Sequence, residues 1–329
     1  MPASYGPSTK HCCSSSASSR FRARTKLVPA VLRLVADQEV GSLRRSLERR
    51  TVAIVCVIPL RSAVWIRGRE PRDSRRGYSR LVHLGVMLPN FGKDSSPDGI
   101  RRVAESAEQL GFDSVWATEH IIVGPEAVAY GRVYDPLITL GWIAGWTDRI
   151  GLGTSIVLVP LHNPMRLAKE VATLQELSGG RFTLGVGMGS HRDEFDFMGL
   201  EFKGRGRRAD EAIRLMRALW NGERDFDGQY WSFHNATSEP HPSPQAEIWV
   251  GGSSERAIRR ALELGDAWHP SSGSDANHVR RVKEQHPELR VIPRSSLERV
   301  EAMLDAGAEG VVATFPDEAA MRDFARRYR

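Results

Sequence analysis

An eightfold alternation of short apolar runs and amphipathic stretches is the feature of this sequence that most constrains its fold. The apolar runs are residues 83–89, 112–120, 149–160, 181–189, 247–252, 266–271, 288–293 and 309–316. After each run, apolar positions recur every three to four residues, as on one face of a helix. Continuous apolar strands separated by helices indicate a parallel sheet with both faces buried. Eight strand–helix units in about 250 residues predict a (β/α)8 TIM barrel, in the α/β class.

The alternative is an open, doubly wound parallel sheet. Such sheets commonly carry a glycine fingerprint, G-x-G-x-x-G, between the first strand and the first helix. Residues 85–92, where the fingerprint would lie, do not show this pattern. The barrel is therefore the favoured fold.

Residues 1–82 differ in character from the rest of the chain. They hold 17 of the 46 Lys and Arg residues but only 5 of the 40 Asp and Glu, so the formal charge of +6 derives from this segment. Its apolar run, 51–60, is too short to span a bilayer, which takes about 20 residues. We expect 1–82 to be a basic, poorly ordered extension, a transit peptide, or sequence upstream of the true start at Val82. Residues 83–329 are the predicted folded domain.

The basic charge of the extension says nothing about the partners of the domain, for which neither nucleic acid nor a membrane is predicted. All three cysteines, Cys12, Cys13 and Cys56, lie in the extension. The domain sequence therefore excludes a disulfide framework, a Cys-ligated metal and a Cys nucleophile. No spacing of His, Asp and Glu typical of a metal site occurs, so no metal is predicted. A reducing, cytoplasmic compartment fits this cysteine usage.

Polar side chains gather where the predicted strands end. The carboxyl ends of the strands of a barrel meet at one mouth, where active sites lie. The second strand ends in Glu119 and His120, the fourth in Ser190 and His191, and the sixth contains His269. We predict His120 and Glu119 as catalytic residues. Glu119 would orient His120 or face away from it, since neighbours on a strand point to opposite faces.

A glycine-serine turn after the fifth strand predicts an anion site. Gly251, Gly252, Ser253 and Ser254 join this strand to the N-terminus of a helix. Unpaired N–H groups and the helix dipole attract phosphate there, and glycine allows close approach of the backbone. The alternative is a plain turn with a serine N-cap.

Glycine also recurs at every second position along the fourth strand, at Gly185, Gly187 and Gly189. Glycine on a barrel strand makes room for a ligand or relieves packing against a neighbouring group. We favour the approach of a planar cofactor and retain packing as the alternative.

Five segments together carry a family resemblance. They are LGVMLPNFG, GFDSVWATEH, IGLGTSIVLVPLHNP, LAKEVATLQELSGGRFTLGVGMG and IWVGGSSERAIRRALELGDAWHPS. The combination resembles the bacterial luciferase-like flavin superfamily, and within it the coenzyme F420-dependent oxidoreductases. The resemblance covers about residues 83–316. It implies an eight-stranded α/β barrel, a homodimer, and insertions at 190–206 and 221–246.

The resemblance also implies roles for single residues. His120 would lie near the reactive carbon of the deazaflavin ring, and the bulge at the third strand, with a cis peptide, would support the ring face. The glycine-serine turn would hold the phosphate of the cofactor, and the end of the fourth strand would line its tail and ring. The implied cofactor-binding residues are Ser155, Ile156, Gly187, Gly189, Ser190, Gly251, Gly252, Ser253 and Ser254.

One position departs from the sugar-phosphate dehydrogenases of this branch, which place a glutamate where this chain has Ser190. Asp193 or Glu194 could supply a carboxylate from the loop instead. The resemblance implies hydride transfer between coenzyme F420 and a small organic substrate, with His120 bonding the reacting oxygen or moving its proton. The alternatives are an FMN-dependent monooxygenase, which uses reduced flavin and oxygen, and a non-catalytic ligand-binding barrel.

Overall fold

The computed structural model describes residues 82–125, 130–271 and 273–329. Contacts along the chain separate a unit Met1–Asp73 from a unit Ser74–Arg329, and all described residues belong to the second unit. The expectations for residues 1–81, including the three cysteines, therefore fall outside the described residues.

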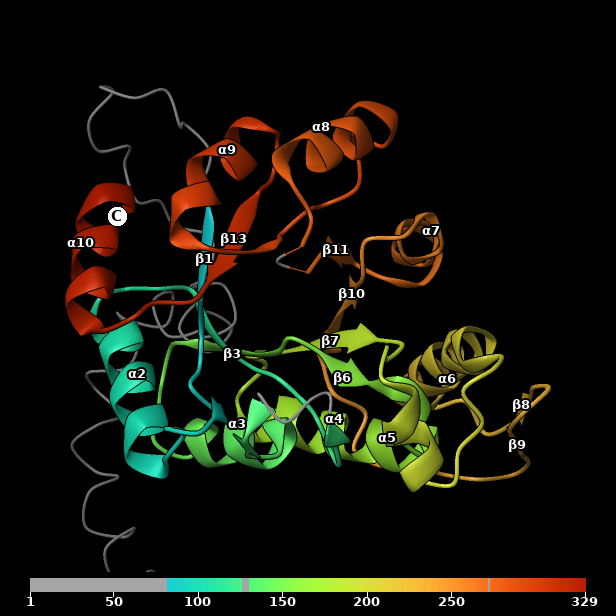
Figure 1. The fold of residues 1–329 in the computed structure, drawn as a ribbon. Helices are drawn as coiled ribbons and strands as arrows, with labels where there is room; N and C mark the ends of the chain where they lie inside the picture. The colour runs from blue at the N-terminus through green and yellow to red at the C-terminus, as the bar shows by residue number, and fades with distance from the viewer. Residues whose placement is uncertain (1–81, 126–129, 272) are drawn as a thin grey trace, which may run out of the picture. The chain divides into compact units, whose positions relative to one another are not determined.

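Within the described part of the chain, eight parallel segments form a ring of strands, shown in Figure 1. They are β1 (His83–Met87), β3 (Ser114–Ala117), β5 (Gly151–Thr154), β7 (Phe182–Gly187), β10 (Glu247–Gly251), β11 (Ala267–His269), β12 (Arg294–Ser295) and β13 (Gly310–Ala313). Their order around the sheet is β11-β10-β7-β5-β3-β1-β13-β12. The predicted TIM barrel is confirmed.

The ring closes between β11 and the segment before β12. Trp268 and Val291 form a parallel bridge. The backbone N–H of Trp268 donates to the carbonyl of Arg290 at 2.8 Å, and that of Ile292 donates to Trp268 at 3.0 Å. The predicted seventh strand, 288–293, is wrong in detail: it is reduced to this bridge and the two residues of β12. Pro293 interrupts it because proline has no N–H to give to the ladder.

Helices follow the strands and cover the outside of the ring. They are α2 (Pro97–Gln109), α3 (Pro136–Ala144), α4 (Pro164–Leu177), α6 (Arg205–Trp220), α7 (Glu255–Leu264), α8 (Ala276–Gln285), α9 (Val300–Asp305) and α10 (Glu318–Tyr328). Three of them begin with proline after a capping side chain, from Ser96, Asp135 and Asn163. Proline and such caps suit a first turn whose N–H groups lack helical acceptors. None of the helices in the described ranges combines the length and apolarity needed to cross a membrane.

Shorter elements lie in the segments that connect the strands and helices. The third strand continues after an interruption as β6 (Val157–Leu158) and a 3-10 turn, η2 (Val159–Leu161). The two expected insertions contain α5 (Arg192–Phe197) and a hairpin of β8 (Phe226–Asp227) and β9 (Ser232–Phe233). A small antiparallel pair joins β2 (Phe91–Gly92) to β4 (Arg132–Val133). A second 3-10 turn, η3 (Leu297–Arg299), precedes α9.

The interior of the ring is packed rather than hollow. Trp116 of β3 is 1% exposed and stacks on Trp249 of β10, with ring centres 4.6 Å apart. A Cβ atom on Gly153 would lie 2.4 Å from the Trp116 ring, so glycine on β5 makes room for the indole. Trp116 is therefore a core residue, and any ligand must bind above it, at the carboxyl ends of the strands.

Candidate functional site

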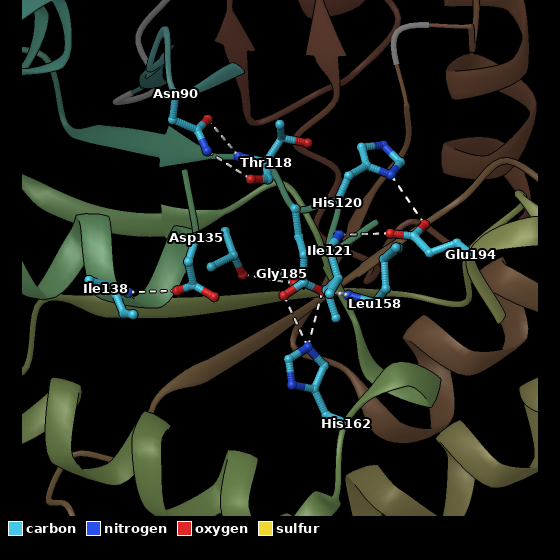
Figure 2. A network of polar contacts seen from close by, with 12 residues as sticks. Asn90, Thr118, His120, Ile121, Asp135, Ile138, Leu158, His162, Gly185 and Glu194 are labelled. Carbon is cyan, nitrogen blue, oxygen red and sulfur yellow. Dashed lines mark hydrogen bonds and ion pairs between the residues drawn. The ribbon is translucent and has the colours of Figure 1, made fainter. Parts of the chain in front are cut away.

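His120 follows β3 and is held by a buried carboxylate from α5. Its Nδ1 atom lies 3.2 Å from Oε2 of Glu194, and the backbone N–H of Ile121 donates to Oε1 at 2.8 Å, as Figure 2 shows. Burial alone would raise the pKa of Glu194, but these hydrogen bonds outweigh it and hold the pKa below its ordinary value. Since an ionised carboxylate only accepts, Nδ1 carries the proton. Among the described residues, Nε2 of His120 has no hydrogen-bond partner, and in the neutral form of the ring it is an acceptor.

Glu119 turns to the opposite side of the chain segment. Its Oε2 accepts the Leu158 N–H at 2.6 Å, and His162 donates from Nε2 to its two oxygens at 3.0 and 3.1 Å. In Figure 2, His162 lies below this segment and Glu194 lies to its right. Burial would lower the pKa of His162, but the hydrogen bond and charge of Glu119 raise it. The carboxylate that holds His120 is therefore Glu194, supplied by the loop, and Glu119 instead fixes β6 and η2.

Two aromatic side chains pack against His120. The ring of Tyr130 lies 3.9 Å from the imidazole, centre to centre, and that of His191 lies 5.5 Å away. Tyr130 and His191 also meet edge-on, at 5.9 Å. The His120 side chain remains 10% exposed. Glu194, Tyr130 and His191 thus orient the His120 imidazole, and a small part of its surface stays exposed.

The bulge predicted at the third strand is present, since the Ser155–Ile156 peptide bond is cis. The Ser155 hydroxyl lies 2.8 Å from Nε2 of His269, whose Nδ1 lies 2.5 Å from the carbonyl of Ile292. Burial lowers the pKa of His269 to about 4, so this imidazole is neutral. A carbonyl only accepts, so Nδ1 carries the proton, and Ser155 donates to Nε2. This hydrogen bond to His269, which reaches across the ring of strands, fixes the position of the Ser155 hydroxyl.

The glycines at the end of β7 make room for neighbouring side chains. A Cβ atom on Gly187 would lie 1.7 Å from Cδ1 of Ile156, and one on Gly189 would lie 2.8 Å from the ring of Phe195. Gly189 also has a φ of +70°, a conformation that favours glycine. The packing alternative thus accounts for both glycines. Ser190, the next residue, is exposed.

The glycine-serine turn after β10 has the features of an anion cradle. Gly252 has a φ of +101°, and the Ser254 hydroxyl caps α7 by accepting a backbone N–H at 3.3 Å. The Ser253 hydroxyl lies 2.5 Å from that of Ser274. Within the described ranges, the backbone N–H groups of residues 253–256 have no hydrogen-bond acceptor. Free N–H groups at a helix N-terminus suit a phosphate, so the chain fits a phosphate-bearing cofactor here.

Three residues of the mouth were not predicted. Asn90 is fully buried and holds Thr118 by both its backbone groups, at 2.8 and 3.0 Å, which fixes the turn before His120. Tyr130 packs on His120, and Arg294 begins β12. Asn90 and Arg294 were visible as polar residues directly after apolar runs. Tyr130 gave no such signal, because it lies in a connecting segment far from any strand end.

Metal ligation finds no support in the described ranges, which hold no cluster of three or more His, Cys, Asp or Glu side chains placed to bind an ion. The site therefore consists of the oriented imidazole of His120, the hydroxyl of Ser155 that is held by His269, and the backbone N–H groups of residues 253–256.

Comparisons with known proteins agree with this fold. An F420-dependent glucose-6-phosphate dehydrogenase of Kineococcus radiotolerans is 34% identical over 183 residues, 54% of this chain and 53% of the relative. The oxygenase component of a flavin-dependent trigonelline monooxygenase of Acinetobacter baylyi is 27% identical over 192 residues, 57% of this chain and 52% of the relative. The chain thus spans about half the length of these curated relatives.

A solved structure shares the architecture. An F420-dependent secondary alcohol dehydrogenase, in complex with an F420-acetone adduct, aligns with a TM-score of 0.65 at 17% identity, over 74% of this chain and 97% of that one. At this identity the likeness concerns the fold alone. The family model for luciferase-like monooxygenases matches residues 78–329, which include the whole barrel. The chain belongs to the luciferase-like monooxygenase family.

Proposed function

We propose that this protein is a coenzyme F420-dependent oxidoreductase that transfers a hydride between the deazaflavin and a small organic substrate. The observation that carries the proposal is the His120 imidazole, held by buried Glu194 at the same mouth as the N-terminus of α7. Among the described residues, neither Nε2 of His120 nor the N–H groups of residues 253–256 have a hydrogen-bond partner. Relatives named as F420-dependent dehydrogenases, at 34% and 40% identity, support the choice of cofactor.

The residues that would hold the cofactor follow two strands, β10 and β5. The N–H groups of residues 253–256 would bind its phosphate, and the bulge at Ser155 and Ile156 would support one face of the ring. When bound, a deazaflavin accepts or gives two electrons as hydride and reacts poorly with oxygen. The protein supplies orientation and a packed floor, made by Trp116 and Trp249, that keeps water out from below.

His120 would handle the proton. When an alcohol is oxidised to a carbonyl, the proton of the O–H bond would pass to Nε2 of His120, and the bound cofactor would supply the acceptor for the hydride of the C–H bond. Glu194 stabilises the resulting imidazolium because its carboxylate already accepts from Nδ1. In the opposite direction the same atom returns the proton to the oxygen. Glu194 is thus a positioning residue, and Glu119 supports the fold of the bulge.

A second candidate is an FMN-dependent monooxygenase, favoured by the match to the trigonelline monooxygenase component. Titration of the full chain with F420 and with FMN separates the candidates. Tight binding of F420 with weak or no binding of FMN supports the proposal, and the reverse supports the monooxygenase. Binding of neither would leave a non-catalytic ligand-binding barrel and would overturn both.

The oligomeric state and compartment belong to the same proposal. We propose a cytoplasmic homodimer, and α3 offers an apolar face for a second copy, since Ile138 is 76% exposed and Trp142 is 37% exposed one turn later. Exposed apolar side chains that adjoin one another commonly mark an interaction surface. The molar mass of the full chain from light scattering tests the dimer.

A further inference from the structure

Among the described residues, Arg294 has no counterion at the mouth of the barrel. It follows Pro293, is the first of the two residues of β12, and is partly buried. Within the described ranges, its guanidinium makes no hydrogen bond or ion pair. Two other arginines of this chain with little exposure are satisfied: partly buried Arg181 donates to the carbonyls of Ile150 and Thr147 at 2.7 and 2.8 Å, and buried Arg260 pairs with Asp210.

Partial burial of the Arg294 guanidinium destabilises the folded protein, because a charge without a partner loses part of its hydration on burial. Burial lowers the pKa of Arg294 below its ordinary value. The nearby imidazole of His269 is neutral and carries no compensating charge. A residue that destabilises the protein in this way, at the end of the barrel where ligands bind, is typical of a binding site rather than of a structural contact.

The surroundings of Arg294 suit an anionic oxygen group. A cavity of about 330 Å³ adjoins β12 and the end of β13, and its polar lining residues are Arg294, Ser295, Ser296, Thr314 and Glu298. The Glu298 carboxylate accepts hydrogen bonds from its own backbone N–H and from Ser296, and it faces solvent. The planar guanidinium fork binds carboxylates and phosphates with two parallel hydrogen bonds.

Aromatic contacts connect Arg294 to His120, the residue that would handle the proton. Its guanidinium carbon is 5.8 Å from the ring centre of Phe91, which lies 6.2 Å from that of Tyr130. Tyr130 in turn packs on His120 at 3.9 Å. Two aromatic side chains, Phe91 and Tyr130, therefore lie between Arg294 and His120. The predicted phosphate site of the cofactor is a separate site, because it lies after β10 at the N-terminus of α7.

We infer that Arg294 binds a carboxylate or phosphate group of the substrate, with hydroxyls of Ser295, Ser296 and Thr314 beside it, while the carbon to be oxidised or reduced faces His120. The substrate class is therefore a small organic anion. This inference rests on the proposed function, since it concerns the substrate of the same mouth.

Calorimetric titration of the full chain, without cofactor, tests the inference with succinate and inorganic phosphate as probes. We expect saturable binding of at least one probe, weakened by about tenfold or more in Arg294→Met because a charged hydrogen bond is lost. The better probe identifies the group as carboxylate or phosphate. The control Arg166→Met, which changes an exposed arginine of α4, should bind as the native protein does.

Two further measurements make the assignment specific. The Tm of Arg294→Met should equal or exceed that of the native protein, because an unpaired cation is removed, whereas a clear fall would indicate a structural partner. F420 should bind Arg294→Met as tightly as the native protein, whereas lost affinity would assign the anion to the cofactor. Each of these two contrary results would overturn the inference, as would equal probe affinity in both proteins or no probe binding. If no F420 binds at all, the proposed function fails, and the probe titration still decides the role of Arg294.

Discussion

Glu119 and His120 are adjacent in the chain, yet they serve different tasks because successive side chains of a strand point to opposite faces. Glu119 is 3% exposed and satisfies Leu158 and His162, while His120 faces the mouth. A carboxylate that satisfies two buried donors matters for folding, and an oriented imidazole with one free nitrogen matters for proton transfer. The two roles predict different consequences of mutation.

Removal of the Glu119 carboxylate should destabilise the protein. In Glu119→Ala the Leu158 N–H and the His162 ring lose their acceptor, and we expect the free energy of unfolding to fall by about 3 kcal/mol. Glu170→Ala is the matched control, because its partner Arg166 is 77% exposed and surface pairs contribute about 0–1 kcal/mol. Urea unfolding at pH 6 measures both variants. An equal fall in the free energy of unfolding in the two variants would contradict the stabilising role of the Glu119 contacts.

Changes at His120 and Glu194 should affect turnover more than binding. His120→Ala should lower kcat by about 100-fold or more with F420 affinity nearly unchanged. Glu194→Gln should lower kcat less and move the midpoint of the kcat pH profile to lower pH, since the carboxylate that stabilises the protonated ring is lost. Steady-state kinetics across pH measure both effects. Unchanged turnover in His120→Ala would remove this residue from the mechanism.

At the scale of elements, the third strand is shaped by its contacts with β7. The cis peptide interrupts the strand between β5 and β6, and the Ile156 side chain packs over the glycines of β7. A Cβ atom on Gly185 would lie 1.8 Å from the backbone oxygen of Thr154, whereas one on Gly187 would meet only the tip of Ile156. A backbone atom cannot yield as a side-chain tip can.

These contacts predict a graded response to alanine. Gly185→Ala should cost about 3 kcal/mol or more, and Gly187→Ala about 1–3 kcal/mol. Adding Ile156→Val, which removes the clashing Cδ1 atom, should recover stability in Gly187→Ala and not in Gly185→Ala. Thermal and urea unfolding of the single and double variants would show the difference, and equal recovery in both would argue against the packing described.

For the whole molecule, two buried neutral histidines set the response to acid. Burial lowers the pKa of both His83 and His269 from 6.5 to about 4. Between these values the unfolded chain binds more protons than the folded chain, so the free energy of unfolding falls as pH falls through this window. The raised pKa of His162 acts oppositely: its contribution is complete below pH 6.5 and is lost as pH rises through the raised value.

Urea unfolding between pH 7 and pH 4.5 measures this slope. His269→Gln should flatten it, because one of the two groups no longer titrates. His234→Gln is the control, since the His234 side chain is 63% exposed. An unchanged slope in His269→Gln would mean that His269 is not held neutral in the folded protein.

The sequence predicts local order well and long-range contacts poorly. The eight strand–helix units follow from periodicity, because each unit buries its own apolar face, and the cis bulge follows from the family resemblance. The partner of His120 lies 74 residues away, in a loop helix. Tyr130 reaches the mouth from a connecting segment. Such contacts depend on how loops meet over the ring, and they leave no period in the sequence. The sequence therefore left Glu119, Asp193 and Glu194 all open as the carboxylate beside His120.

A crystal structure of the full chain with bound F420 tests the central claim most directly. The proposed function predicts the cofactor phosphate on the N–H groups of residues 253–256, the ring against the Ser155–Ile156 bulge, and its reactive carbon facing His120. A phosphate bound elsewhere, or a reactive carbon directed away from His120, would overturn the proposed arrangement.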